Sequence, residues 1–344
     1  MTVPIVAGTD GSEESLAAVQ WAAVEAVRRR VPLRIVHVLE HHTGPAAHTQ
    51  QLRHGPHHPG WVRHDLPHGA KSALARASRR AKDAAPGVDL LATAVSGHAD
   101  QVLTAITDRA SLLAIGTRGT GDGQVSGLRL GSVALCLARR ARCPVVFTAA
   151  GSRPVVHEIV VGTDDSDEAT AALEFSFGEA DVHGARLTAV YAWEHPEAGR
   201  LDGYHDWVLS VDPVDKGAAA LLSEQVAWWR HKYPEVIVTE SPVRGHAGRV
   251  LAFASQSTDL IVVGARRGLA SSIGLGPVTN AMLHHAQCPV AVIPGSIVPW
   301  AAAREDVEIA RQTRAALGRP APYITPGSAA QRRPANGRSV SPDR

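Results

Sequence analysis

The chain has 344 residues, of which 44% are hydrophobic and 20% charged, a balance that supports substantial cores and excludes a wholly disordered protein. At about 150 residues per domain, the length predicts two domains and a remainder. Lys and Arg number 35 and Asp and Glu number 33, so the net charge of +2 is not that of a dedicated nucleic-acid binder.

Short β-branched runs alternate with longer alanine-rich patterns of helical period in the first part of the chain. We expect strands at 5–7, 33–39, 88–95, 112–115 and 145–148, and helices at 13–30, 69–84, 99–108 and 132–141. This alternation predicts an α/β, Rossmann-like domain: a five-stranded parallel sheet of order 3-2-1-4-5 with helices on both faces. Ligands of such sheets bind beyond the carboxyl ends of the strands.

The second part of the chain repeats the first. Between residues 5–41 and 159–195, 15 of 37 aligned positions are identical, and Cys143-Pro144-Val145 recurs as Cys288-Pro289-Val290. A repeat this long is a complete domain rather than a solenoid unit. We therefore expect two tandem Rossmann-like domains, 1–150 and 151–296. The expected strands of the second are 159–162, 186–193, 236–240, 260–263 and 290–293.

Residues 297–344 differ in composition from the two repeats. Pro, Gly, Ser and Arg dominate from Gly318 onward, and the segment holds eight arginines and four acidic residues. This composition predicts a basic, disordered tail, which carries the positive charge of the chain.

Several features bear on compartment and partners. No run of about 18 apolar residues occurs, and the first residues lack the pattern of a signal peptide, so we expect a cytoplasmic protein with no membrane or nucleic-acid partner. The cysteines, Cys136, Cys143 and Cys288, lack Cys-x-x-Cys spacing, and we expect Cys143 and Cys288 to be buried apolar groups rather than redox sensors.

A glycine-rich stretch, residues 116–132, joins the fourth strand of the first repeat to its fourth helix. Glycine lets successive backbone N–H groups approach an anion closely, and the start of a helix also favours phosphate. Gly131-Ser132 opens that helix. The alternative is an ordinary flexible loop followed by a capped helix.

Asp10 follows the first strand, and Ser12 precedes the first helix. The first and fourth strands are neighbours in a 3-2-1-4-5 sheet, so both loops face one crevice. Asp10 then either binds ribose hydroxyls or a phosphate-bound metal, or forms only a capping turn with Ser12. Asp164 and Ser166 repeat the pair and do not decide between the two roles.

Together these residues resemble the tandem universal stress proteins, of the adenine-nucleotide α-hydrolase-like superfamily, over about residues 1–295. The shared motifs are Gly-x-x-Gly, a spacer and Gly-Ser, an early Gly-x-Asp-x-Ser strand end, and a late Cys-Pro-Val strand. The resemblance implies an ATP-binding protein, with or without Mg²⁺, that acts in stress responses and forms a homodimer or an intramolecular pseudo-dimer through its last strand. It implies nucleotide contacts for Asp10 and for the backbone near Val38, and phosphate contacts for Gly116, Gly119, Gly131 and Ser132.

The first repeat departs from the family pattern in its phosphate loop. Eleven residues rather than nine separate Gly119 from Gly131, and Asp122 adds a negative charge. Arg118, Arg129 or a divalent ion would have to offset that charge beside a phosphate.

The second repeat departs further. Arg267 replaces the second glycine after Gly264, and Gly276-Pro277 replaces Gly-Ser, which removes an N–H donor and a hydroxyl. Arg266 and Arg267 can compensate by contacting phosphate directly. We therefore expect asymmetry: the first site binds ATP, while the second, around Asp164, Gly264, Arg267 and Gly276, binds weakly or is structural.

Three classes of function remain open. The leading one is a nucleotide-responsive binding module without turnover. The second is a slow ATPase or autophosphorylating enzyme, although no Walker motif and no nucleophile–base set is evident. The third is an interaction protein that binds no nucleotide. Nothing identifies the protein partner.

Other polar and aromatic groups have simpler interpretations. Residues 41–68 hold eight histidines without fixed ligand spacing, so we expect a solvated variable loop, with zinc, nickel or copper binding as the alternative. We expect Trp228-Trp229 to be core plus interface, and His98 and His246 to be caps or packing residues.

Overall fold

The computed structural model of the chain describes residues 2–40, 66–117, 130–149, 151, 155–193, 216–265 and 275–295. The first repeat forms β1 (Ile5–Gly8), α1 (Glu13–Arg29), β2 (Leu33–Leu39), α2 (His68–Ala84), β3 (Leu90–Ser96), α3 (Ala99–Ile106), β4 (Leu112–Gly116), α4 (Ser132–Arg140) and β5 (Val145–Thr148). The second forms β6 (Glu158–Thr163), α5 (Asp167–His183), β7 (Arg186–Trp193), α6 (Lys216–Lys232), β8 (Val238–Arg244), α7 (Ala247–Ala254), β9 (Leu260–Gly264), α8 (Pro277–His285) and β10 (Val290–Ile293).

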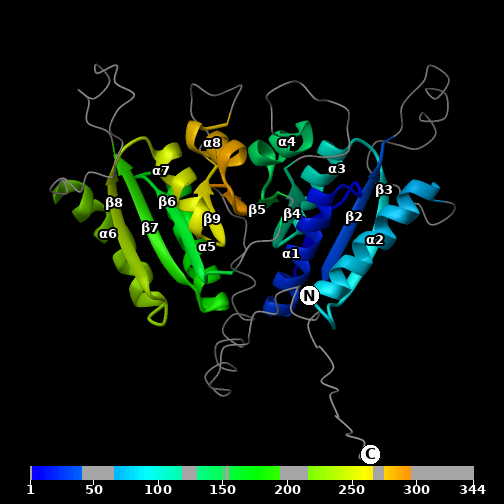
Figure 1. Cartoon of the computed structure of the whole chain (residues 1–344), viewed down its shortest axis with the longest axis horizontal. Helices are drawn as coiled ribbons and strands as arrows, with labels where there is room; N and C mark the ends of the chain where they lie inside the picture. The colour runs from blue at the N-terminus through cyan, green and yellow to red at the C-terminus, as the bar shows by residue number, and fades with distance from the viewer. Residues whose placement is uncertain are drawn as a thin grey trace, which may run out of the picture.

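The strands lie in the order β3-β2-β1-β4-β5-β10-β9-β6-β7-β8 (Figure 1). The predicted α/β fold and its 3-2-1-4-5 order are thus confirmed in each half, where neighbouring strands are parallel. The two predicted five-stranded sheets form one ten-stranded sheet, because β5 and β10 pair in antiparallel fashion. Val146 lies opposite Ala291 at the centre of this pairing. The last strands of the two repeats therefore join within one chain.

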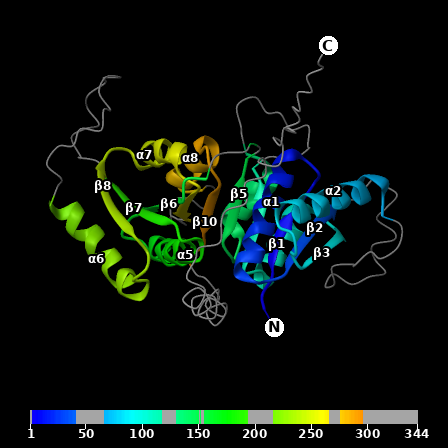
Figure 2. The same ribbon diagram turned by 60° about the horizontal axis from the view of Figure 1, so that its bottom comes forward.

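Successive side chains of each strand point to opposite faces of the sheet, and they contribute to two apolar cores, one on each face. On β1, Ile5 and Ala7 belong to the core that includes residues of α1, α2, α5 and α6, whereas Val6 belongs to the core that includes residues of α3, α4, α7 and α8. Figure 2 shows this division in the second half, where α7 and α8 lie on one side of the strands and α5 and α6 on the other. Each core contains residues of both repeats, so the halves share their packing. No described helix combines the length and apolar content that a bilayer crossing needs.

Element ends differ from the sequence prediction mainly at β8. We expected this strand at 236–240, but it runs from Val238 to Arg244 through Pro242. Proline cannot donate to a ladder, and here it is tolerated because β8 is the edge of the sheet and pairs only with β7. The third helix is also shorter than predicted, since α3 ends at Ile106 and a 3₁₀ turn follows over Thr107–Arg109.

Glycine ends β4 and β9 because a helix backbone passes too close for a side chain. A Cβ atom on Gly116 would lie 2.8 Å from backbone atoms of Glu14 and Ser15, in the first turn of α1. A Cβ atom on Gly264 would meet the backbone of Glu168 in α5 at the same distance. Both glycines are therefore needed for packing, whatever they do for a ligand.

A buried ionic cluster joins α1 to α5 across the junction between the repeats. It consists of Glu25, Arg28 and Arg29 of α1 and Glu179 and His183 of α5, which we call the junction cluster. Arg29 pairs with both glutamates, and each glutamate side chain is only 1% exposed. His183 Nε2 lies 2.8 Å from Glu25 Oε2, and Arg28 Nη1 lies 2.8 Å from His183 Nδ1.

The charge state of Glu25 follows from these contacts. Burial raises the pKa of a carboxyl group, but His183 and Arg29 outweigh that effect and hold the pKa of Glu25 well below its usual 4.5. A carboxyl with a lower pKa folded than unfolded contributes stability above its unfolded-state pKa. It loses that contribution as the pH falls through the folded-state value.

Replacing Glu25 with Gln should lower the free energy of unfolding at neutral pH by roughly 3 kcal/mol, because Arg29 and His183 lose a buried partner. The deficit relative to wild type should shrink as the pH falls below about 5, because Glu25 of the unfolded wild-type chain then takes up a proton while the folded carboxylate stays charged. Urea unfolding at pH values on both sides of this limit measures it, with the exposed Glu235→Gln as control. An equal deficit at pH 3 and pH 7 would contradict the assignment of Glu25 as a buried, charged partner.

Gly116→Ala and Gly264→Ala should each destabilise the protein by roughly 1–3 kcal/mol, because the added methyl group displaces the first turn of α1 or α5. Gly69→Ala in α2 is the matched control, since a Cβ atom there has no heavy atom within 4 Å. Thermal and urea unfolding of the three variants compare the effects. Wild-type stability in Gly116→Ala would show that the close approach does not constrain the residue.

Candidate functional site

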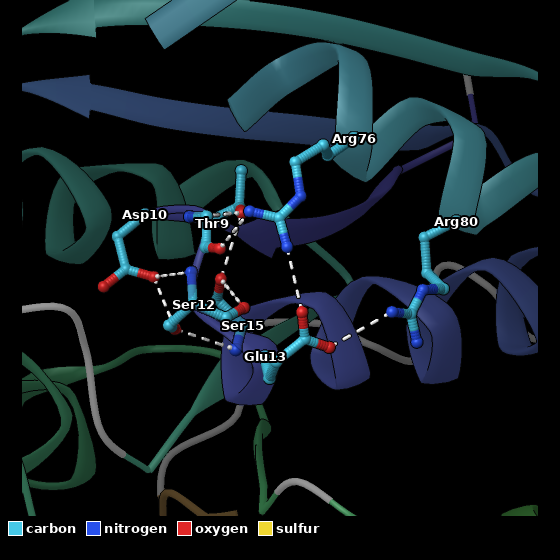
Figure 3. A network of polar contacts seen from close by, with 8 residues as sticks. Thr9, Asp10, Ser12, Glu13, Ser15, Arg76 and Arg80 are labelled. Carbon is cyan, nitrogen blue, oxygen red and sulfur yellow. Dashed lines mark hydrogen bonds and ion pairs between the residues drawn. The ribbon is translucent and has the colours of Figure 1, made fainter. Parts of the chain in front are cut away.

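The turn between β1 and α1 is built from side chain to backbone bonds (Figure 3). Asp10 Oδ1 accepts hydrogen bonds from Ser12 N at 2.9 Å and from Ser12 Oγ at 2.6 Å. Ser12 Oγ in turn accepts from Ser15 N at 3.2 Å, which caps α1. The capping role considered for Asp10 and Ser12 is thus present, and it leaves the ligand role of Asp10 as a proposal.

The second repeat contains the same turn. Ser166 N donates to Asp164 Oδ1 at 3.0 Å, Ser166 Oγ also donates to Asp164, and Ala169 N donates to Ser166 Oγ at 3.2 Å. The shared sequence motif therefore has a shared structural role at the start of α1 and α5. Any difference between the two candidate sites must come from other residues.

Charged side chains of α2 distinguish the first turn from the second. Arg76 donates to the carbonyl oxygen of Gly11 at 3.2 Å and to Glu13 Oε1 at 2.9 Å, while Arg80 donates to Glu13 Oε2 at 3.1 Å (Figure 3). These side chains are well exposed, so the ion pairs contribute little stability. Their geometric effect is to place two guanidinium groups beside the β1–α1 turn.

A neutral side chain of α6 contacts the turn in the second repeat. Gln225 of α6 accepts from Thr163 Oγ1 at 2.7 Å and donates to the Asp164 carbonyl at 3.1 Å. An amide of α6 thus contacts the second turn, whereas an arginine of α2 contacts the first, at a different backbone carbonyl. The electrostatic surroundings of the two turns differ accordingly.

The start of α4 lies close to the end of β4. Gly131 N donates to the Thr117 carbonyl at 2.9 Å, and Thr117 N donates to Thr148 at 2.9 Å, so Gly131 is tied beside Gly116. Gly131 is the N-cap and offers no side chain, and the first turn of α4 contains no acidic residue. This helix start is therefore suited to an anion in both charge and hydrogen bonding.

The start of α8 is chemically different. Gly276 is again the N-cap, but Pro277 occupies the first helical position and has no N–H group. Thr279 Oγ1 donates to the Gly264 carbonyl at 3.0 Å, so this hydroxyl ties the helix to β9. One N–H donor and one hydroxyl that the first repeat has at Ser132 are absent at the aligned position.

The structure brings several predicted site residues to one edge of the sheet. Asp10 follows β1, Gly116 ends β4 beside the first turn of α1, and Gly131 and Ser132 adjoin Gly116. Val38 is half-buried near the end of β2, opposite Val95 of β3. In the second repeat, Asp164, Gly264 and Gly276 have the corresponding places. Four further predicted residues, Arg118, Gly119, Arg266 and Arg267, lie outside the described residues.

Most of the remaining residues that we singled out have structural roles. Cys143 and Cys288 are buried as expected, and burial raises the pKa of the Cys143 thiol to about 12. Trp229 is buried, whereas Trp228 is 57% exposed. His98 and His246 occupy N-cap positions without a side-chain capping bond. Of the His-rich stretch, residues 41–65 lie outside the described residues.

The junction cluster was not among the predicted features. Its signal in the sequence is faint: the repeat aligns Glu25 with Glu179 and Arg29 with His183, four residues apart on each helix. Such a pair usually lies on an exposed helix face. Only the meeting of the two repeats reveals that this one is buried.

Comparison with known proteins places the chain in a family. The sequence model of the Universal stress protein family matches this chain twice, at residues 1–148 and 156–294. One universal stress protein of Mycobacterium tuberculosis is 33% identical over 297 residues, which cover 84% of this chain and 96% of that protein. Another from the same organism is 29% identical over 304 residues, covering 85% and 97%.

One solved structure that spans most of the chain agrees on the fold. A universal stress protein from Archaeoglobus fulgidus is similar over 85% of this chain and 96% of its own, with a TM-score of 0.56 at 16% identity. A universal stress protein in complex with cAMP is similar over 43% of this chain and 97% of its own, with 27% identity and a TM-score of 0.31. The two family matches cover most of the sequence, and the chain belongs to the universal stress protein family.

Proposed function

We propose that the chain binds an adenine nucleotide in its first domain and acts as a nucleotide-responsive regulatory module in stress responses. The observation that carries this proposal is the start of α4, which has no capping side chain and no acidic residue in its first turn. It adjoins the carboxyl ends of β4 and β1, where ligands of such sheets bind. The domains are 1–150 and 151–296, with the tail from 297.

The other helix start at this edge is a poorer site for phosphate. Ser12 caps α1 through its own hydroxyl, and Glu13 and Glu14 place two carboxylates in the first turn. These charges already interact with the positive end of the helix and repel an anion. The contrast between the two helix starts supports a phosphate position at Ser132 of α4 rather than at α1.

The remaining parts of ATP have natural neighbours in the first domain. Asp10 is half-buried at the end of β1, where its carboxylate suits ribose hydroxyls or a phosphate-bound Mg²⁺. Val38 near the end of β2 offers backbone groups to the adenine. The exposed Arg76 beside the β1–α1 turn adds positive charge that favours a polyphosphate. Arg118 and Gly119 complete the proposed phosphate contacts.

The second site, around Asp164, Gly264, Arg267 and Gly276, is proposed to be the weaker one. Pro277 supplies neither the N–H nor the hydroxyl that Ser132 supplies, and the α6 side chain that contacts the second turn is the neutral Gln225, whereas Arg76 of α2 contacts the first. Each lost hydrogen bond to a charged phosphate costs about 1.5–3 kcal/mol of affinity. Turnover is not required by this function, and a slow ATPase remains the alternative.

Ser132→Pro gives the first domain the residue that the second domain has at the aligned position. It should lower ATP affinity by roughly a hundredfold or more, because it removes an N–H donor and a hydroxyl together. Ser132→Ala, which keeps the N–H, should lose less. Proline fits the first helical position, so the fold should survive, as circular dichroism can verify. Isothermal titration with ATP compares the variants. Unchanged affinity in Ser132→Pro would place the phosphates elsewhere.

A further inference from the structure

The junction cluster is nearly, but not fully, symmetric between the two repeats. Glu25 aligns with Glu179, while Arg29 aligns with His183 and Arg28 aligns with Val182. The pairing of β5 with β10 is symmetric about Val146 and Ala291, which also align in the repeat. A like pair of two first or two second repeats can therefore adopt the same backbone arrangement, and the cluster is where its buried charged side chains would differ.

In the observed unlike pair every charged group of the cluster has a complementary neighbour. Arg29 pairs with Glu25 and Glu179, and His183 Nε2 donates to Glu25 at 2.8 Å. Arg28 can only donate, so the Nδ1 atom of His183, 2.8 Å away, is its acceptor. Two carboxylates thus meet two guanidinium groups, and the imidazole bridges between them.

Neither like pair reproduces this match. In a pair of first repeats, the position of His183 would be taken by Arg29 of the other copy, so Arg28 would face a second guanidinium instead of an acceptor. In a pair of second repeats, two Glu179 carboxylates would be buried with two imidazoles and no arginine. Like charges, or buried carboxylates without a permanent cation, cost several kcal/mol at an interface.

We propose that the junction cluster selects the pairing partner of each half: it fits a first domain to a second domain and rejects like pairs. The selection depends on one position in particular, since His183 must accept from Arg28 while donating to Glu25. The partner that this face of a first domain fits is therefore a second domain, either the one in the same chain or the one in a second copy.

A metal ion is the competing use of these side chains. Glu25, Glu179 and His183 place ligand atoms within 4.8 Å of one another. Arg29, however, already pairs with both carboxylates, and the bond from Arg28 leaves the proton of His183 on Nε2, the atom that faces them. A protonated nitrogen is not a ligand. The geometry therefore favours a closed ionic network.

The test removes the covalent connection after folding. A protease site inserted between Gly151 and Val155 allows the folded full-length chain to be cut between its halves. The cut protein is mixed with an isotope-labelled copy, at the lowest urea concentration that lets labelled and unlabelled halves exchange. Native mass spectrometry then distinguishes unlike pairs from like pairs by mass.

Wild type and His183→Gln should give almost only unlike pairs, because a glutamine amide can also accept from Arg28 and donate to Glu25. His183→Arg should raise the share of second-half pairs at least about tenfold, since it sets Arg28 against an arginine and supplies each Glu179 with a cation. Like pairs in the cut wild type would overturn the proposal. So would wild-type pairing in His183→Arg, or loss of unlike pairs on adding EDTA.

Discussion

Strands β5 and β10 pair in antiparallel register at the centre of the sheet, and this pairing brings α1 against α5 on one face. The contact buries Glu25 and Glu179, which are tolerated there because Arg29 pairs with both and His183 completes the network. Both apolar cores continue across the same junction. The tandem repeat is thus one folded unit, and the position of each candidate site relative to the other is set by this contact.

Packing and ligand chemistry overlap at the candidate sites. Gly116 must lack a side chain because α1 passes within 2.8 Å of where a Cβ atom would be. Asp10 and Ser12 form the turn that starts the same helix. A glycine or aspartate in this motif is therefore not by itself a sign of nucleotide binding, and Gly264 and Asp164 have the same structural roles in the second domain. The two domains differ at the first residue of the helix after the glycine-rich stretch, which is Ser132 in the first and Pro277 in the second. Substitutions at this position therefore test nucleotide binding without changing the residues that both domains need for packing.

The sequence was sufficient to predict the fold of each half, because the β-strand and helix periods alternate clearly and the repeat is visible in the strand-end motifs. It did not predict the limits of β8, since Pro242 normally ends a strand and is allowed only at an edge. The junction cluster was missed for a different reason. A Glu–Arg pair four residues apart is typical of an exposed helix face, and its burial arises from contacts between residues about 150 positions apart in the chain.

The predicted site residues that the structure describes lie at one edge of the sheet in each half, as parallel strands require, whereas nucleotide binding itself remains a proposal. Its central claim is that the first domain holds ATP more tightly than the second, so that only the first keeps it through purification. Native mass spectrometry of the full chain, purified without added nucleotide, counts the molecules that remain bound. The proposal predicts about one ATP per chain, and two per chain or none would contradict it.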